Sequence, residues 1–485
     1  MNRVYKLGIL MLALGGLLWQ AGAFSLLGPY KTWQVPAIGY NRPGDIGGPM
    51  TPSERYRWNV PSITYAFDQS FINYFGSNGI AAVEEAIAIL NNLPPASAIT
   101  NDGANLYVNG DVVPREVLRR NYSLEAAGLL DVKSTALSLL LEELGLARAK
   151  RWVFALRGRA TETINGVTFT NYAVVKLNYD PITLRPSSYV NGTLYSYVIR
   201  DPIRDPLGGD YADATEFSVD PTSFDVGAVA ENPPPPGHFF IGLSHDDVGG
   251  LRFIYDPNNF ANESLVTNVV GGSPLGGDNP WLPYLGATNA TNIFLTGTNA
   301  FFNTNIFGSN LVVQGLRPGI NKLFFDRVNY DSLLGQTFTS ITNRYTDTYL
   351  SNAVFVSQPV ERVLNQPDIL FVSTDLGLIP PGLAPWLNAR TGTGGWQNNA
   401  TLNSNMPTNT LGGPGVIPPP VRIMFTDQLP VLLNQNPFFV DEASASVSAI
   451  WGSFDETTNA PIIYPQYGTL TLEDIQRLLM SGSNP

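Results

Sequence analysis

The sequence predicts an α+β domain over residues 53–258, followed by a mainly β, sandwich-like domain over residues 288–470. In the first part, apolar residues recur at helical spacing in some runs and alternate in others. In the second part, short alternating apolar runs are separated by turn residues, which is typical of β sandwiches and barrels. Residues 259–287 between them are rich in Asn, Gly and Pro and are typical of a linker.

The start of the first domain predicts one strand and two helices. Residues 63–67 are β-branched and aromatic, which favours a strand. Apolar residues spaced as on one helix face predict a helix over residues 80–93, which two prolines end. The same spacing over residues 137–144 predicts a second helix, and Gly145 is expected to stop it.

The middle of the first domain predicts strands and then a loop. Residues 151–159 and 171–179 alternate like the two strands of a hairpin, and residues 194–199 predict a further strand. Residues 201–237 are loop-rich in composition.

A capped helix is expected to close the first domain before Pro257. Ser244 can accept a hydrogen bond from the amide three residues further on, and Asp247 stands in the positive first turn. The buried face of this helix is expected to consist of Val248, Leu251, Ile254 and Tyr255.

The second domain predicts short strands and one long excursion. Its alternating runs lie at residues 310–313, 322–327, 353–356, 369–373 and 421–425. Residues 380–420 are rich in Gly, Asn, Thr and Pro and are expected to form a long exposed loop. Residues 471–485 are expected to close the chain as a short helix and tail.

Residues 1–23 have the three regions of a cleavable secretory signal peptide. A positively charged start precedes the uncharged apolar residues 7–19, and residues 21–23 (Ala-Gly-Ala) form a small-residue cleavage site. Cleavage there makes Phe24 the first residue of the mature chain. The apolar run is shorter than the ~20 residues that cross a bilayer, which disfavours the alternative of an uncleaved anchor. Residues 24–52, rich in Gly and Pro, are expected to form an extended arm.

The composition limits the classes of partner. Only 14% of the 485 residues are charged, against roughly 25% in ordinary globular proteins. A neutral polar surface repels other chains less than a charged one, which favours contacts with other proteins or with copies of this chain. The net charge of −12 disfavours a nucleic acid partner. Without cysteine, stability must come from burial, tight turns or assembly.

Two segments of the first domain resemble the matrixin branch of the metzincin zinc peptidases. Arg57-Trp58-Asn59 followed by Ile63-Thr64-Tyr65 is similar to the opening of such a catalytic domain. Residues 243–255 (LSHDDVGGLRFIY) resemble its closing helix, L-x-x-D-D-V-x-G-I-x-x-L-Y. The resemblance implies a metzincin-like α+β frame over roughly 200 residues, weak between the two matching segments.

The zinc-binding motif of that family has no match in this sequence. The motif H-E-x-x-H-x-x-G-x-x-H places two His on one helix face, a Glu beside them, and a Gly before the third His. The chain has only two histidines, His238 and His245, and the spacing between them is one residue too long. Prolines at residues 233–236 exclude a helix just upstream. We therefore interpret the first domain as a metzincin-like frame without a catalytic site.

Asp246 and Asp247 are expected to have structural roles. The resemblance implies that Ser244, Asp246 and Asp247 cap the closing helix and that the Asp pair ties down a neighbouring backbone or chain terminus. A metal site formed by His238, His245 and Asp246 is the alternative, although no third ligand matches a known spacing.

Other candidate sites are weaker. A run of acidic residues could hold calcium, but it fits no EF-hand spacing: Asp201, Asp205, Asp210, Asp213, Glu216, Asp220 and Asp225. Some aromatic residues in polar loops could stack on sugars, contact a neighbouring subunit or pack against their own domain: Trp281, Tyr284, Trp386 and Trp396. Glycosylation triplets begin at Asn121, Asn191, Asn262, Asn289 and Asn399.

These observations predict a secreted, non-catalytic structural or binding protein of the cell surface or extracellular matrix, with self-assembly as one form of that role. The alternatives are a divergent secreted zinc metallopeptidase or other hydrolase, and a carbohydrate-binding protein. No catalytic residue is assigned. No cofactor is assigned either, and bound calcium is the alternative. The expected partners are protein chains, this chain among them, or a glycan. A nucleic acid partner is not expected, and after cleavage of the signal peptide no membrane span is expected.

Overall fold

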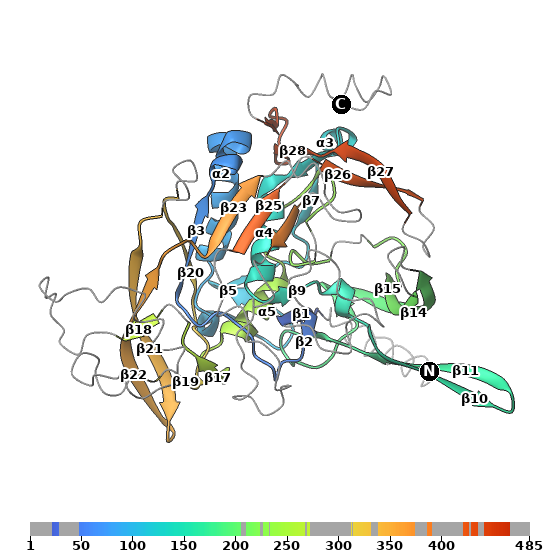
Figure 1. Ribbon diagram of the computed structural model, residues 1–485, viewed down its shortest axis with the longest axis horizontal. Coiled ribbons are helices and arrows are strands. Elements are labelled where there is room, and N and C mark those ends of the chain that lie inside the picture. The colour runs from blue at the N-terminus through green and yellow to red at the C-terminus, as the bar shows by residue number, and fades with distance from the viewer. Residues whose placement is uncertain are drawn as a thin grey trace, which may run out of the picture.

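The computed structural model describes residues 22–28, 48–204, 210–223, 227–231, 233–266, 269–271, 312, 314–330, 338–373, 386–389, 421–425, 428–434 and 441–465. These residues form a β-rich protein in which a few helices pack against several sheets (Figure 1). The expectation of a β-rich chain is therefore confirmed. Most of the predicted signal peptide, residues 29–47 of the arm, most of the linker and of the loop 380–420, and the C-terminal helix lie outside the described residues.

Three helices lie where the sequence predicted helices, although two of them begin earlier than expected, and a fourth, short helix was not predicted. They are α2 (Gln69–Asn91), α3 (Tyr122–Ala126), α4 (Val132–Glu143) and α5 (His245–Tyr255), with the 3₁₀ turns η2 (Ala96–Ala98) and η3 (Lys150–Trp152). Helix α2 begins well before the predicted residue 80, because Asp68 caps it by accepting from the Phe71 amide at 3.0 Å. Gly76, with a φ of 62°, interrupts its periodicity. Among the helices within the described residues, none has both the length and the apolarity to cross a membrane.

A mixed sheet lies at the centre of the described residues. Its strands run in the order β20 (Phe324–Arg327), β3 (Ser62–Phe67), β23 (Ile369–Ser373), β25 (Val421–Phe425) and β24 (Trp386–Ala389). The first four strands are parallel, and β24 pairs antiparallel with β25. Strands buried on both faces are typical of parallel sheets, and β23 has that character, whereas β25 is fully buried on one face and partly buried on the other.

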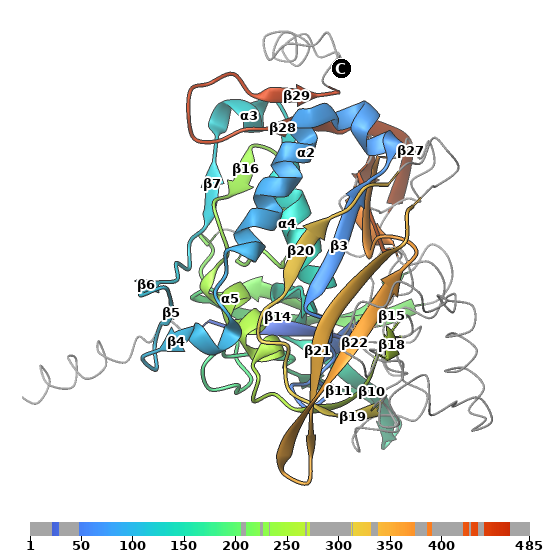
Figure 2. The same ribbon diagram turned by 90° about the vertical axis from the view of Figure 1, so that its left-hand side faces the viewer.

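Helix α2 covers one face of this sheet (Figure 2). Because side chains alternate along a strand, Phe67, Phe371 and Phe425 share the face that meets the helix. The rings of Phe67 and Phe371 stack with centroids 5.3 Å apart. Phe71 of α2 lies 5.0 Å from Phe67 and 5.8 Å from Phe425. These aromatic side chains form part of a continuous hydrophobic core.

Strands from both predicted domains therefore share one sheet. Strand β3 comes from the first predicted domain, and β20, β23 and β25 come from the second. These three strands do not form a sandwich of their own within residues 288–470, and the predicted linker does not divide the sheets. The alternating runs specify strands correctly, but the partner of a strand is set by long-range packing, for which a local pattern carries no signal.

An antiparallel sheet lies beside the central one. Its order is β17 (Ala261–Ser264), β19 (Gln314–Arg317), β21 (Ile341–Ser351), β22 (Val354–Leu364) and β18 (Val269–Gly271). Strands β21 and β22 form a long hairpin whose tip exposes Val354 and Phe355.

The first strand is part of the fold. Strand β1 (Phe24–Gly28) pairs with β2 (Gly48–Met50), β9 (Leu146–Ala147) and β12 (Asn178–Tyr179), and it is buried along its length. The two ends of the predicted arm thus lie within a sheet, because their apolar residues contribute to the core.

The remaining strands form smaller sheets. One consists of β4 (Thr100–Asn101), β5 (Leu106–Val108) and β6 (Asp111–Val112), and another pairs β7 (Leu118–Arg120) with β16 (His238–Phe240). A third joins β8 (Leu129–Asp131) to β28 (Ile450–Ser453) and β29 (Ile462–Tyr464), and a fourth pairs β26 (Gln428–Asn434) with β27 (Asp441–Ser448).

Two further hairpins leave the body. Strands β10 (Ala155–Ile164) and β11 (Val167–Val175) pair along their whole length, so the predicted hairpin exists with shifted ends. Strand β13 (Tyr189–Val190) pairs with β14 (Thr193–Arg204), which pairs with β15 (Asp210–Ser218). The expectation of a loop over residues 201–237 was therefore wrong for β14 and β15, which include Asp201, Asp210, Asp213 and Glu216.

Candidate functional site

The N-terminus of helix α5 is a buried polar centre. Ser244 is the N-cap and accepts from the Asp247 amide, while the Ser244 amide donates to the Asp247 carboxylate at 3.0 Å. The same carboxylate accepts from the amides of Val229 and Ala230 at 3.0 and 2.9 Å. Burial raises the pKa of Asp247, and these hydrogen bonds act in the opposite direction. The capping box thus also anchors the loop before β16.

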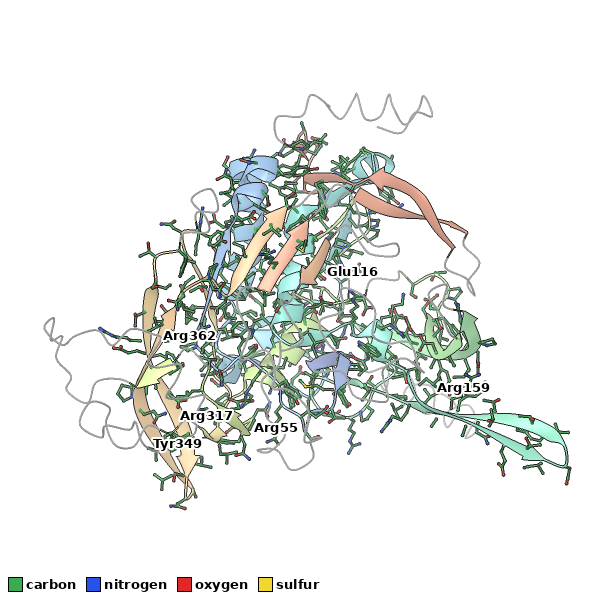
Figure 3. All side chains as sticks on the ribbon, in the orientation of Figure 1. Arg55, Glu116, Arg159, Arg317, Tyr349 and Arg362 are labelled. Carbon is green, nitrogen blue, oxygen red and sulfur yellow. The ribbon has the colours of Figure 1, made fainter. Side chains whose placement is uncertain are left out.

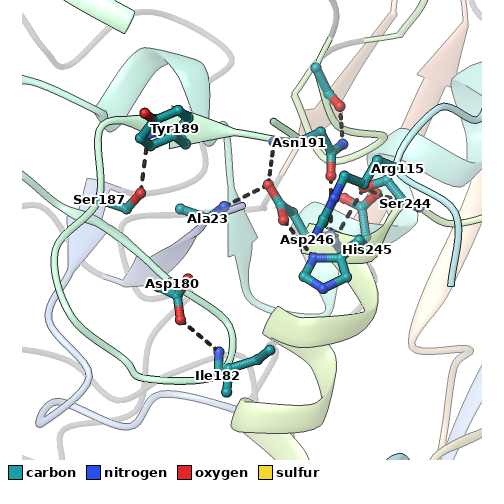
Figure 4. A network of polar contacts seen from close by, with 12 residues as sticks. Ala23, Arg115, Asp180, Ile182, Ser187, Tyr189, Asn191, Ser244, His245 and Asp246 are labelled. Atoms are coloured by element: carbon teal, nitrogen blue, oxygen red, sulfur yellow. Dashed lines mark hydrogen bonds and ion pairs between the residues drawn. The ribbon is translucent and has the colours of Figure 1, made fainter. Parts of the chain in front are cut away.

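Asp246 connects the residue that precedes β1 to helix α5 (Figure 4). One carboxylate oxygen, Oδ2, accepts from the backbone amides of Ala23 and Asn191, each at 2.6 Å, and the other lies 3.1 Å from Nδ1 of His245. The Asp246 side chain is fully buried, so these donors replace the water that a carboxylate requires. A Cβ atom at Gly22 would lie 1.9 Å from Oδ1 of Asp246, which requires glycine at that position.

The two histidines are buried and lie in different elements. Nδ1 of His238, in β16, lies 3.0 Å from the carbonyl oxygen of Pro236. His245 is the first residue of α5, and its Nε2 has no hydrogen-bond partner within the described residues. No group of three or more His, Cys, Asp or Glu side chains that could hold a metal ion occurs in the described part of the chain. The candidate set His238, His245 and Asp246 is therefore not assembled into a metal centre there.

Helix α4 is followed by a glycine turn whose spacing from the helix was not used in the predictions from the sequence. Gly145, two residues beyond the helix, has a φ of 102° and turns the chain into β9. Counted from this glycine, the metzincin motif would place its first His and its Glu at Ser138 and Leu139, and its other two His at Glu142 and Arg148. A motif defined by its histidines has no match here. The signal that indicates this turn is the glycine that ends an apolar helix.

Glu142 and Arg148 form an ion pair across that turn. Nε of Arg148 lies 3.3 Å from Oε1 of Glu142, and the Glu142 side chain is 14% exposed. Ser138 and Leu139 are buried and present neither an imidazole nor a carboxylate. This set of side chains lacks the nitrogen ligands of a catalytic zinc and the base that activates its water.

The acidic residues after residue 200 are distributed over separate contacts. Asp201 accepts from the Tyr172 hydroxyl at 2.7 Å, Asp213 pairs with Arg151 at 3.0 Å, and Asp220 accepts from the Thr222 amide at 2.8 Å. Asp205 and Asp225, and the side chain of Asp210, lie outside the described residues. The described members of the run, Glu216 included, therefore belong to no group of three or more possible metal ligands.

The predicted surface features are described only in part. Trp281, Tyr284, Trp396 and the side chain of Trp386 lie outside the described residues, as do Asn289 and Asn399. The amide groups of two further triplets take part in the fold: Nδ2 of Asn121 donates to the Asp455 carbonyl oxygen, and that of Asn191 donates to Gly227.

Asp246→Asn should lower the free energy of unfolding by about 2 kcal/mol, because the backbone amide of Asn191 loses a buried, charged acceptor. Urea denaturation followed by circular dichroism measures this loss. Asp220→Asn is the matched control, because Asp220 also accepts two local hydrogen bonds but is exposed to water. The loss should be much smaller in the control. Equal losses would mean that the buried contacts of Asp246 add nothing.

Comparison of the chain with protein-family models, with curated proteins and with solved structures gave no significant match.

Proposed function

We propose that this chain is an exported, non-catalytic protein that assembles with copies of itself at the cell surface or in the extracellular matrix. The observation that carries the proposal is the β10–β11 hairpin, which projects from the body (Figure 1). Within the described residues it forms a sheet of its own, with no third strand. Figure 3 shows side chains along the hairpin beyond Arg159, where it leaves the body.

The two faces of this hairpin carry little of the charge that usually protects exposed strands: beyond Arg159 the one charged side chain is Glu162, which lies opposite Phe169. Asn165 and Gly166 form a two-residue turn with positive φ values, so the register is fixed and cross-strand partners share a face. Near the turn, one face presents Ile164, Val167 and Phe169, which are about half exposed. The other face presents a ladder of threonines, at residues 161, 163, 168 and 170.

A second copy of the chain suits this surface. An isolated two-stranded sheet is marginally stable in water, and its outer edges carry unpaired backbone groups. Pairing with an identical edge satisfies those groups, and packing the faces that present Val167 against each other removes apolar surface from water. The low charge content of the chain favours the same association.

The proposal includes export with cleavage before Phe24. Gly22 and Ala23 are buried, so a peptidase must act on this site before the chain folds. Cleavage removes Ala23, whose amide contacts Asp246, and leaves a new ammonium group on the adjacent residue, Phe24. A positive terminus there would compensate the buried carboxylate.

The absence of catalysis is supported by the composition of helix α4. We propose that residues 53–258 contain a metzincin-like frame whose zinc helix is α4. The order of β3, α2, α4 and the capped α5 supports this assignment, as does Gly145. At the ligand positions, the Glu142–Arg148 ion pair takes the place of two histidines. A peptidase that used this helix would have no zinc ligands.

Native mass spectrometry of the mature protein, at concentrations from about 1 to 100 μM, tests the proposal. We expect dimers or larger assemblies, and Val167→Lys should weaken them about tenfold or more, because it places a charge in the contact. Val112→Lys is the matched control, because Val112 is 53% exposed and Val167 is 56% exposed. The control should assemble like the unchanged protein.

Two outcomes would overturn the proposal. A chain that stays monomeric over the whole range would remove self-assembly. One tightly held zinc ion per chain in the same spectra would favour the metallopeptidase alternative.

A further inference from the structure

Strand β11 forms an unprotected edge of the β10–β11 hairpin. Its 9 residues, Val167–Val175, include no charged residue and no proline, and most of them are exposed. Natural edge strands are usually protected from further pairing by charge, by proline or by a covering element. Within the described residues β11 pairs only with β10, so its outer edge has no strand partner there.

Strand β10 has the protection that β11 lacks. It contains three charged residues, Arg157, Arg159 and Glu162. Arg159 forms an ion pair with Asp201 of β14, and β10 also contacts β15. The two edges of the hairpin therefore differ, and β11 provides the edge that is open to a further strand.

The turn between the two strands determines which backbone groups of β11 point outward. A two-residue turn is closed by a hydrogen bond between its flanking residues, so Ile164 and Val167 form a hydrogen-bonded pair. Hydrogen-bonded and non-hydrogen-bonded pairs then alternate along the ladder, and the second kind direct their backbone groups outward. Val174, which is one of these, packs against the core where the hairpin joins the body. The outward N–H and C=O groups that remain for pairing belong to Thr168, Thr170 and Tyr172.

We propose that β11 pairs antiparallel with β11 of a second copy, with Thr170 on the two-fold axis. The inference rests on the proposed self-assembly and adds the strand, its direction and its register. In this register Thr170 lies opposite Thr170 of the second copy, and Thr168 lies opposite Tyr172. All the outward groups of these three residues then find partners. Moving the axis by one residue toward the turn leaves those of Tyr172 unpaired, and moving it the other way requires Val174.

The strand is self-complementary in this register. Residues directly opposite one another share a face, so no two like charges meet although the chain has a net charge of −12. The product is a four-stranded sheet, whereas a lone hairpin is marginally stable in water. Both copies present Val167 on the same side of that sheet, which leaves this apolar face for packing against another.

Thr170→Pro in the mature protein tests the choice of strand. The outward amide of Thr170 makes no hydrogen bond to β10, so proline removes a bond between copies and none within the hairpin. We expect native mass spectrometry to show assembly weakened about tenfold or more. Thr161→Pro is the matched control, because Thr161 is the cross-strand partner of Thr170 and its amide points outward at the β10 edge. The control should assemble like the unchanged protein.

The lack of cysteine in the chain allows the register to be tested without proline. Under mild oxidation Thr170→Cys should give a disulfide-linked dimer, because Cα atoms of a hydrogen-bonded pair lie about 5.5 Å apart, within the range that a disulfide spans. In Thr168→Cys the two thiols lie four residues apart along the strands, about 14 Å, and should stay unlinked. Thr161→Cys, on β10, should also stay unlinked.

The outcomes separate this inference from the proposed function. If the unchanged protein assembles but Thr170→Pro assembles equally well, or Thr161→Cys links the copies in place of Thr170→Cys, β11 is not the contact. Faster linking by Thr168→Cys than by Thr170→Cys would show that the register is wrong. An unchanged protein that stays monomeric would remove self-assembly itself, and this inference with it.

Discussion

Arg362→Met should lower the free energy of unfolding by about 3–5 kcal/mol, because it leaves Asp368 buried without its cation. Arg362 in β22 contacts both carboxylate oxygens of Asp368, and each of the two side chains is 4% exposed. Asp368 also accepts from the amide and hydroxyl of Thr64, in β3, at 2.9 and 3.0 Å. The substitution therefore loosens the contact between the central sheet and the neighbouring antiparallel sheet. Urea denaturation at fixed salt measures the loss.

Arg344→Met is the matched control for this experiment. Arg344 lies in the adjacent strand β21 and pairs with Glu361 at 2.7 Å, with side chains 67% and 28% exposed. An exposed pair of this kind contributes at most about 1 kcal/mol. If the two variants lose the same free energy, burial does not determine the contribution of the Arg362 pair.

Buried arginines also connect other parts of the chain. Arg57 pairs with Glu263 at 2.8 Å and donates to the Arg317 carbonyl oxygen at 3.1 Å. Arg317 in turn holds both oxygens of Asp347 at 3.0 Å. These contacts link residues from both predicted domains. The described residues should therefore unfold cooperatively, although a linker composition predicts two independent units.

The sequence predicted those elements whose signals are local. Strands over residues 63–67, 369–373 and 421–425 were expected because β-branched and aromatic residues fit a pleated, buried surface. The start of α5 was expected because Ser244 and Asp247 form a capping box, which depends only on neighbouring residues.

The remaining features depend on distant residues. Nothing near Tyr65 specifies that β3 pairs in parallel with β23, some 300 residues later. The contact between Asp246 and Ala23 spans 223 residues, and only the family resemblance suggested that this carboxylate holds a chain segment. Helix α4 was expected as an apolar helix, but the turn at Gly145 on which we base its proposed alignment with a zinc helix was not recognised, because the aligned positions hold no histidine.

The free energy of unfolding should fall by about 3 kcal/mol as the pH rises from about 4.5 to about 7, because of Glu231. This side chain is 3% exposed, and burial raises its pKa from 4.5 to about 7. Between these values the unfolded chain releases the proton, whereas the folded chain retains it, so each step up in pH favours unfolding. The raised pKa of Asp131, about 6, adds to the decline at the lower end.

Urea denaturation at a series of pH values measures this slope, and Glu231→Gln should flatten it, because the amide resembles the protonated acid at every pH. Glu116→Gln changes an exposed carboxyl group in the same way and should leave the slope unchanged. Lys150 and Arg148 act against the effect of burial, since their positive charges lower the pKa of Glu231. A free energy of unfolding that rises across this range would therefore mean that these cations, and not burial, determine the charge of Glu231 in the folded protein.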